Sequence, residues 1–204
     1  MYALITDGSI SKFINNPKAL VIGDVQYPAK IFQLWSTSEL NAIGIYEVTF
    51  DNTNKKDEQW YINTNQSYAY DADAGTVTAT YGSATAKLHA DTLFTAQDET
   101  DGKGTEGEVA VRGLKYNLIK NLKSQVANEL ARTDWYITRN TEKSTAIPSS
   151  ISTHRDAVRT KQATMETQIT NAADTPALET LYTYTTDGDG VQSRPLGELP
   201  TLDS

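Results

Sequence analysis

Cysteine is absent from the 204 residues of this sequence, so disulfide bonds, thiolate zinc sites and cysteine nucleophiles are all excluded. Histidine is scarce as well. His89 and His154 lie far apart in the sequence, and neither has a partner at the spacing of a metal site. We therefore expect no metal ion and no other cofactor. A lone helical histidine such as His154 is far more often structural than a general base.

Long apolar runs are missing too. None approaches the ~18 consecutive apolar residues that cross a bilayer, and residues 1–7 lack the basic flank and small-residue cleavage site of a signal peptide. Lys and Arg (18 residues) are outnumbered by Asp and Glu (26 residues), which gives a net charge of −8. That charge opposes nonspecific binding to nucleic acid. We expect a protein made in the cytosol that binds neither membranes nor nucleic acid.

Apolar residues are few for a compact globule. They make up 38% of the sequence, whereas about 45–50% is usual. Tyrosine (11 residues) outnumbers phenylalanine (4 residues). This balance is typical of an exposed, strand-rich protein with thin cores rather than of an enzyme with a deep pocket. Because strand patterns precede helical ones along the chain, the sequence predicts an α+β fold.

Residues 1–90 are predicted to form a small β-rich domain, an antiparallel sheet with one short helix. Asp7-Gly8 stands between two β-prone runs and is the preferred two-residue hairpin turn, because both residues can take positive φ. Residues 36–44 predict the short helix, with hydroxyl residues to cap its start and Gly44 to end it. Residues 59–70 and 76–81 predict a further pair of strands with one packed face.

Residues 91–112 are predicted to be an acidic, flexible linker. The centre of this segment is rich in glycine and acidic residues and nearly free of apolar side chains. Such a stretch buries too little surface to offset the entropy of ordering it. Gly102, Gly104 and Gly107 do not make a phosphate-binding loop, because the lysine and hydroxyl residue at the head of a following helix are missing.

Residues 113–204 are predicted to form a helical hairpin with a short third helix and an extended tail. The first helix carries one apolar stripe, and the second, from about Ser149 to Ala172, repeats at seven residues. Two amphipathic helices leave much of their stripes uncovered, so we expect an oligomer or a docked partner. The residues predicted to form this interface are Leu118, Leu122, Val126, Leu130, Trp135, Tyr136, Ile151, Val158 and Met165.

Three groups of residues allow more than one interpretation. Trp135 and Tyr136 are predicted to plug the open end of the helical pair, or else to stack on a sugar or a partner subunit. The acidic turn at residues 187–190 resembles part of a calcium loop, but its flanks predict a hairpin turn. Aromatic residues on strands more commonly form a core or an interface than a carbohydrate-binding platform. Both interpretations apply to Trp35, Trp60, Tyr61, Tyr68 and Tyr70.

The region between the two long helices resembles a known kind of protein. The run Asp134-Trp135-Tyr136-x-x-Arg139, then Ala146-Ile147-Pro148, then Arg155-x-Ala157-Val158-Arg159, is similar to a helical domain of unknown function. That domain recurs at the end of tail-fibre and tail-fibre-assembly-type proteins of tailed bacteriophages. Residues 34–36 and 42–46 resemble a small module found at the start of related phage proteins. The resemblance supplies no catalytic residues.

This resemblance implies a structural component of a bacteriophage tail: a tail fibre, a baseplate protein or an attachment adaptor. Such a protein is not an enzyme and acts through protein–protein docking. Its partners are other phage tail proteins and further copies of itself, in a homo-oligomer such as a trimer. Its location is the virion, after synthesis in the host cytoplasm. Two alternatives are a tail-fibre assembly chaperone and an adsorption module that binds a host surface glycan.

Overall fold

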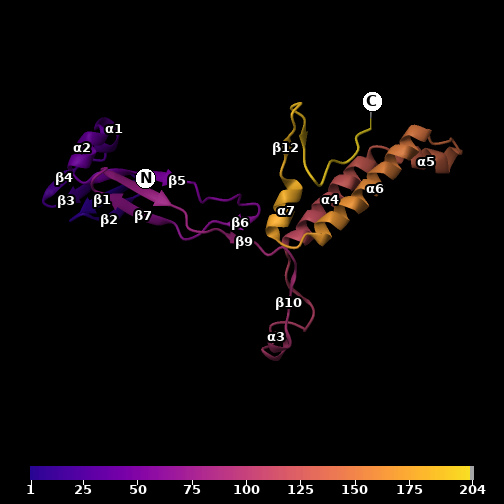
Figure 1. Ribbon diagram of the computed structural model, residues 1–204, viewed down its shortest axis with the longest axis horizontal. Coiled ribbons are helices and arrows are strands. Elements are labelled where there is room, and N and C mark those ends of the chain that lie inside the picture. The colour runs from indigo at the N-terminus through magenta and orange to yellow at the C-terminus, as the bar shows by residue number, and fades with distance from the viewer. Residues whose placement is uncertain (203–204) are drawn as a thin grey trace. The chain divides into compact units, whose positions relative to one another are not determined.

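The computed structural model describes residues 1–202 and divides the chain into two compact units, Met1–Thr85 and Ala86–Ser204 (Figure 1). Strands dominate the first unit and helices the second, so the predicted α+β class is confirmed. The boundary lies close to the predicted limit of the β-rich domain at residue 90. Within the described part of the chain, no helix is both long and apolar enough to cross a lipid bilayer.

The first unit is built on a five-stranded sheet with the order β2-β1-β5-β8-β7. Its neighbours pair antiparallel except β5 and β8, which are parallel. The sheet is therefore mixed, where the sequence predicted an antiparallel one. The strands are β1 (Tyr2–Thr6), β2 (Ser9–Ile14), β5 (Ile45–Asp51), β7 (Ser67–Asp71) and β8 (Thr76–Thr80).

The predicted turn and the predicted short helix both form. Asp7 (φ 51°) and Gly8 (φ 72°) take the positive φ values that join β1 to β2. Ser36 begins α2 (Thr37–Ala42) with a capping box, in which the Glu39 carboxylate accepts from the Ser36 N–H at 2.7 Å. Gly44 (φ 81°) ends this helix and accepts a hydrogen bond from the Ile5 N–H at 2.8 Å. The turn dipeptide and the helix-capping residues were therefore sufficient to predict these two elements from the sequence.

Two small cores stabilise the sheet. Ala3, Val48, Val77 and Ala79 form the first. The second gathers around α2, and its buried residues are Ile31, Leu40 and Ile45. The Phe13 ring on β2 lies 4.4 Å from the Tyr68 ring on β7. Because β2 and β7 are the two edges of the sheet, this contact indicates that the sheet curls.

Shorter elements complete the first unit. Strand β3 pairs with β4, and β6 pairs with β9, each as a separate two-stranded ladder. One short helix, α1, was not predicted from the sequence. These elements are β3 (Leu20–Ile22), β4 (Val25–Tyr27), α1 (Ile31–Leu34), β6 (Tyr61–Ile62) and β9 (Thr85–Ala86).

The predicted flexible linker is instead a folded hairpin, which we call the arm (residues 91–112). It contains β10 (Thr92–Leu93), α3 (Ala96–Thr100) and β11 (Val109–Val111), and β10 pairs antiparallel with β11. Its base is held where the Gly113 N–H donates to Asp91 Oδ1 at 2.8 Å and the Leu114 N–H donates to the Leu88 carbonyl at 2.9 Å. Local capping and backbone pairing order a segment whose composition predicted disorder.

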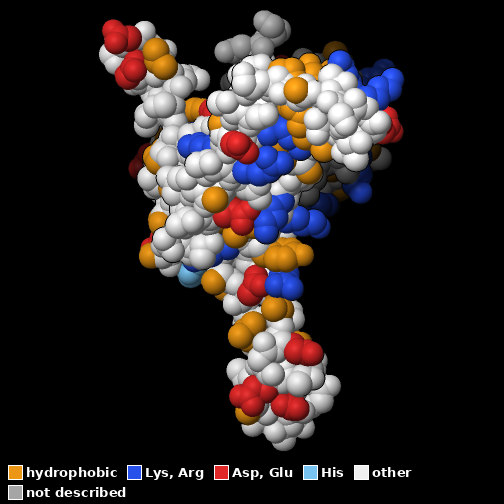
Figure 2. Space-filling model, turned by 90° about the vertical axis from the view of Figure 1, so that its right-hand side faces the viewer, with side chains coloured by type: hydrophobic (Ala, Val, Ile, Leu, Met, Phe, Trp, Pro, Cys, Tyr) orange, Lys and Arg blue, Asp and Glu red, His pale blue; other side chains and the backbone are white. Residues whose placement is uncertain are grey.

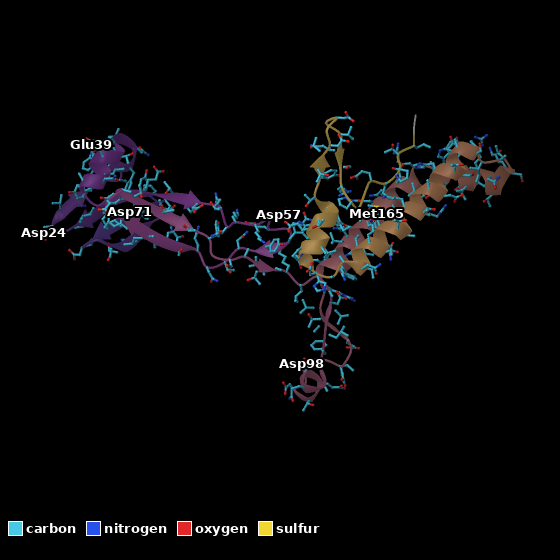
Figure 3. All side chains as sticks on the ribbon, in the orientation of Figure 1. Asp24, Glu39, Asp57, Asp71, Asp98 and Met165 are labelled. Atoms are coloured by element: carbon cyan, nitrogen blue, oxygen red, sulfur yellow. The ribbon has the colours of Figure 1, made fainter. Side chains whose placement is uncertain are left out.

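Asp98 holds the tip of the arm, where Figure 3 labels it. Its carboxylate accepts from the Thr95 hydroxyl at 2.7 Å, from the Thr95 N–H at 3.0 Å and from Lys103 Nζ at 3.0 Å. These hydrogen bonds, that of the Thr95 hydroxyl first, lower the pKa of Asp98 from 3.8 to about 2. They favour the ionised carboxylate, so the ionised form orders the tip.

The pH dependence of the tip follows from that lowered pKa. Because the folded-state pKa lies below the unfolded value, the stabilisation is complete above the unfolded pKa and is lost as the pH falls from 3.8 through about 2. We expect an NMR titration of the Asp98 carboxyl carbon to show a midpoint near 2 in the wild type. Thr95→Ala should move that midpoint upward. Equal midpoints in the two proteins would contradict this account.

The second unit is a hairpin of two long helices with shorter elements around it. Its elements are α4 (Leu114–Ala131), α5 (Asp134–Lys143), α6 (Ser149–Asn171), α7 (Thr175–Tyr182), β12 (Thr185–Thr186) and β13 (Gln192–Ser193). Helix α6 begins directly after Pro148, as predicted. The predicted short third helix is α7, and it is capped by the Asp174 side chain, which accepts from the Ala177 N–H. Helix α5 stands where the sequence predicted a loop.

Candidate docking surface

The apolar stripes of α4 and α6 face one another. Helix α4 packs along α6, and Met165 on α6, which Figure 3 labels, is 2% exposed. Six residues predicted for a partner interface are buried here: Leu118, Leu122, Val126, Ile151, Val158 and Met165. Their prediction as an interface is wrong for this structure, because the chain supplies the second helix that covers the stripe. Leu130 is partly buried at the end of α4.

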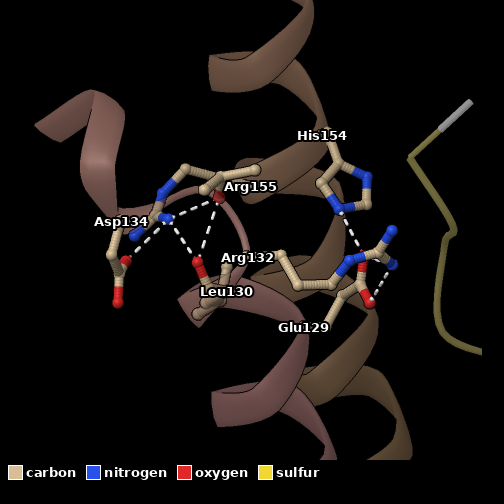
Figure 4. A network of polar contacts seen from close by, with 7 residues as sticks. Glu129, Leu130, Arg132, Asp134, His154 and Arg155 are labelled. Atoms are coloured by element: carbon tan, nitrogen blue, oxygen red, sulfur yellow. Dashed lines mark hydrogen bonds and ion pairs between the residues drawn. The ribbon is translucent and has the colours of Figure 1, made fainter. Parts of the chain in front are cut away.

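Arg155 stabilises the end of the helical hairpin that carries α5 (Figure 4). Its side chain on α6 is buried, and Nη1 donates to the Leu130 carbonyl at 2.8 Å and to Thr133 Oγ1 at 2.7 Å. The same nitrogen lies 2.9 Å from Asp134 Oδ1. The guanidinium thus joins α6 to a carbonyl in the last turn of α4, to the connecting residue Thr133 and to the first residue of α5. Buried hydrogen bonds to a charged donor are among the stronger ones in proteins.

A second ionic contact lies beside the first. His154 Nε2 is 3.0 Å from Glu129 Oε1, and Arg132 Nη1 is 3.0 Å from Glu129 Oε2. His154 and Thr133 are both buried. Among the described residues, no hydroxyl is hydrogen-bonded to the His154 ring, as a nucleophile activated by this base would be. The geometry gives His154 a structural contact that holds α6 against α4.

Of the aromatic pair at the start of α5, Trp135 is exposed and Tyr136 is partly exposed. Trp135 is 51% exposed, and its ring centre lies 3.8 Å from that of Tyr136. The Arg139 guanidinium lies 5.7 Å from the Trp135 ring centre. The prediction that Trp135 plugs the helical pair is therefore wrong, because residues 134–143 form a helix that turns this side chain outward. Together with the exposed Ile137, these residues define the α5 face.

Two parts of the motif that suggested a phage tail protein from the sequence are joined at this end of the hairpin. Asp134, from the first part of the motif, is ion-paired with Arg155, from the last part. No family model matches this chain, and neither does any curated protein or solved structure. The likeness therefore depends on the sequence motif alone, whose first and last parts are joined by the Asp134–Arg155 ion pair.

The aromatic residues of the first unit do not form one open platform. Trp60 (3% exposed) and Tyr61 (5% exposed) are buried. Tyr68 packs on Phe13, and the Tyr70 hydroxyl donates to that of Tyr46 at 3.1 Å. Trp35 meets Tyr27 edge-on, with ring centres 5.8 Å apart. The carbohydrate platform considered from the sequence is wrong for the set as a whole, because packing and hydrogen bonds use most of its rings.

The acidic turn at residues 187–190 joins β12 to β13, as the hairpin interpretation predicted. Asp187 Oδ1 accepts from the Asp189 N–H at 3.0 Å and from the Val191 N–H at 2.9 Å. This carboxylate therefore stabilises the turn itself. Across residues 1–202, no group of three or more His, Cys, Asp and Glu side chains is placed to hold a metal ion.

Sequence reasoning missed helix α5, and with it the exposure of the α5 face. The first turn of α5 does carry a helix signal, because Asp134 is acidic and suits a helix N-terminus. The ion pair that joins Asp134 to Arg155 spans 21 positions of sequence, which no local pattern reveals. Of the nine predicted interface residues, only Trp135 is strongly exposed, and Tyr136 and Leu130 are partly exposed.

Proposed function

We propose that this protein is a non-enzymatic structural component of a tailed-bacteriophage tail, such as a tail fibre, a baseplate protein or an attachment adaptor. It acts by docking onto other tail proteins and onto further copies of itself. It functions in the virion, after synthesis in the host cytoplasm. The motif at Asp134–Arg139 and Arg155–Arg159 supports this proposal, because its residues resemble those of phage tail proteins.

One observation carries the proposal. The α5 face displays Trp135 and Tyr136 on a helix whose first residue is fixed by buried Arg155. Exposed tryptophan and tyrosine on a rigid element are the residue types that dominate protein–protein interfaces. Rigidity matters as well, because a side chain that is already ordered loses less entropy on binding. The exposure and the fixed position of this aromatic pair therefore favour a protein that acts by docking onto another protein.

The deciding experiment is quantitative mass spectrometry of gradient-purified particles of the phage that encodes this chain. We expect the purified particles to contain this protein at a fixed ratio to the other tail proteins. Presence in the lysate but absence from the particle would contradict it and would favour the assembly chaperone instead. Tryptophan fluorescence quenched by a host glycan would favour the adsorption module.

Replacement of Trp135 tests the α5 face directly. We expect Trp135→Ala to leave the melting temperature nearly unchanged, since the side chain is 51% exposed. Incorporation into particles should fall by about tenfold or more, the usual effect of truncating an interfacial tryptophan. The measurement is the ratio of variant to wild-type chain in particles from a complemented infection.

A matched control separates docking from a general loss of surface aromatics. Phe50→Ala removes a ring that is equally exposed (51%) on strand β5 of the other unit. We expect this variant to enter particles as the wild type does. Equal incorporation of the Trp135 and Phe50 variants would remove the support that the α5 face gives to the proposed function.

A further inference from the structure

The outer side of α4 carries an apolar hollow with a basic rim. Tyr116, Ile119, Lys120 and Lys123 line this hollow, whose volume is about 330 Å³. These residues recur at helical spacing beside the buried stripe of Leu118 and Leu122. The Arg112 guanidinium, at the base of the arm, lies 4.2 Å from the centre of the Tyr116 ring and is paired with Asp91 Oδ2 at 2.6 Å, so the charge of the rim comes from the two lysines. We call the four lining residues the α4 hollow.

The charge of the α4 hollow restricts what it can bind. Lys120 is exposed, and Lys123 reaches Glu166 only at 3.6 Å with its own side chain 58% exposed. A two-fold contact of the hollow with itself would bring four lysines together, which like-charge repulsion opposes. An acidic segment that also carries apolar side chains satisfies both the rim and the floor.

The arm has that chemistry. Between residues 94 and 108 it holds five acidic residues (Asp98, Glu99, Asp101, Glu106, Glu108) and one basic residue (Lys103). Figure 2 shows acidic side chains at the end of the projecting arm and Lys and Arg side chains over the helices of the same unit. Apolar Leu93 and Val111 on the arm are about half exposed. The arm therefore combines negative charge with uncovered apolar surface.

The arm also lacks the support that such a hairpin needs. A two-stranded hairpin alone is marginally stable in water, and β10 and β11 form a ladder with no third strand. Figure 1 shows the arm extending away from α4, so its acidic tip does not lie over the α4 hollow of its own chain. A second copy is the occupant that supplies complementary charge to both surfaces.

We infer that the arm of one copy docks in the α4 hollow of a second copy. Glu106 and Glu108 face the lysines of the rim, and the apolar side chains of the arm cover Tyr116 and Ile119. The contact is heterologous, because two different surfaces meet, and such a contact forms a ring of copies, such as a trimer, when the rotation between neighbours closes and an open filament when it does not. The inference rests on the homo-oligomer in the proposed function and adds the surfaces that form it.

Charge reversal in the full-length chain tests this contact. One variant is K120E/K123E, a second is E106K/E108K, and a third carries all four substitutions. All four side chains are exposed, so circular dichroism and the melting temperature should match the wild type. Sedimentation velocity across a concentration series gives the dissociation constant. Lys18→Glu with Lys30→Glu is the matched control, because these two exposed lysines lie in the first unit.

The expected pattern is specific to an arm-to-hollow contact. Each double variant should raise the dissociation constant by about tenfold or more, and the fourfold variant should return it to within about threefold of wild type. The control should not change it. Raising salt from about 50 mM to about 500 mM should weaken association of the wild type.

Three results would overturn the inference. Oligomers that persist in both double variants would mean that copies associate through other surfaces. Dissociation of both double variants without recovery in the fourfold variant would mean that arm and hollow have different partners. A wild-type chain that stays monomeric at every concentration would exclude self-association. In each case the protein's presence in purified particles still decides the proposed function separately.

Discussion

Arg155→Ala is expected to destabilise the protein by about 3 kcal/mol, since it removes two hydrogen bonds from a charged donor, an ion pair and the packing of a buried side chain. The variant removes the Arg155 hydrogen bonds to the Leu130 carbonyl and to Thr133 Oγ1 and the ion pair with Asp134. The Leu130 carbonyl keeps its hydrogen bond from the Thr133 hydroxyl. It also leaves a void between α5 and α6. Urea unfolding followed by circular dichroism at 222 nm gives the free energy of unfolding.

Arg159→Ala is the matched control for that measurement. Arg159 lies one helical turn further along α6 and pairs with Asp156 at 3.4 Å, and both side chains are more than half exposed. Exposed ion pairs contribute little, so we expect a change of less than about 0.5 kcal/mol. If Arg155→Ala were as mild as Arg159→Ala, Arg155 would not be the residue that fastens α5.

Gly113→Ala is expected to destabilise the second unit by about 2 kcal/mol, as overpacking of a tight site does. Gly113 is buried at the start of α4, and a Cβ atom there would overlap the carbonyl group of Ala90. The clash involves backbone atoms, so no side chain can rotate to relieve it. Relief requires the base of the arm to move, which breaks the hydrogen bond from the Gly113 N–H to Asp91. Thermal unfolding should show the loss.

Gly188→Ala provides the comparison at a site with open space. A Cβ atom at Gly188 meets no atom within 4 Å, and this glycine does not have positive φ. We expect a change within about 0.5 kcal/mol, as for most surface substitutions. Equal melting temperatures for the Gly113 and Gly188 variants would show that the backbone between residues 90 and 113 can shift to accommodate the added Cβ atom at little cost in stability.

Elements with a local signal were predictable from the sequence. The Asp7-Gly8 turn and the Ser36–Glu39 cap each depend on residues within a few positions of one another. Helix α5 shows the opposite case. It contains Ile137, Thr138 and Thr141, which are β-branched, and the side chain of Thr133 does not cap its start. A contact from Arg155 in the following helix stabilises it, and such tertiary support leaves no local pattern.

The arm was mispredicted for a different reason. Its composition indicated disorder, yet Thr95 and Asp98 have the spacing of a capping box, which was visible in the sequence. A low apolar content reflects a small buried area but not the hydrogen bonds that Asp and Thr side chains make with the backbone. In the helical hairpin, the apolar stripes were predicted correctly. The sequence pattern, however, does not show which surface covers them. The chain's own α6 does so, and this moved six predicted interface residues into the core.

The parallel pairing of β5 with β8 has a consequence for synthesis of the chain. Val48 lies opposite Val77, and the residues between them include all of β6 and β7. The β1–β2 hairpin can form as soon as it is made, but β5 has no partner on its second edge until β8 emerges from the ribosome. Pairings between distant residues form late because a long loop must close first. The nascent first unit therefore presents a bare strand edge during translation until β8 has emerged from the ribosome, which is the interval when another chain could pair with it.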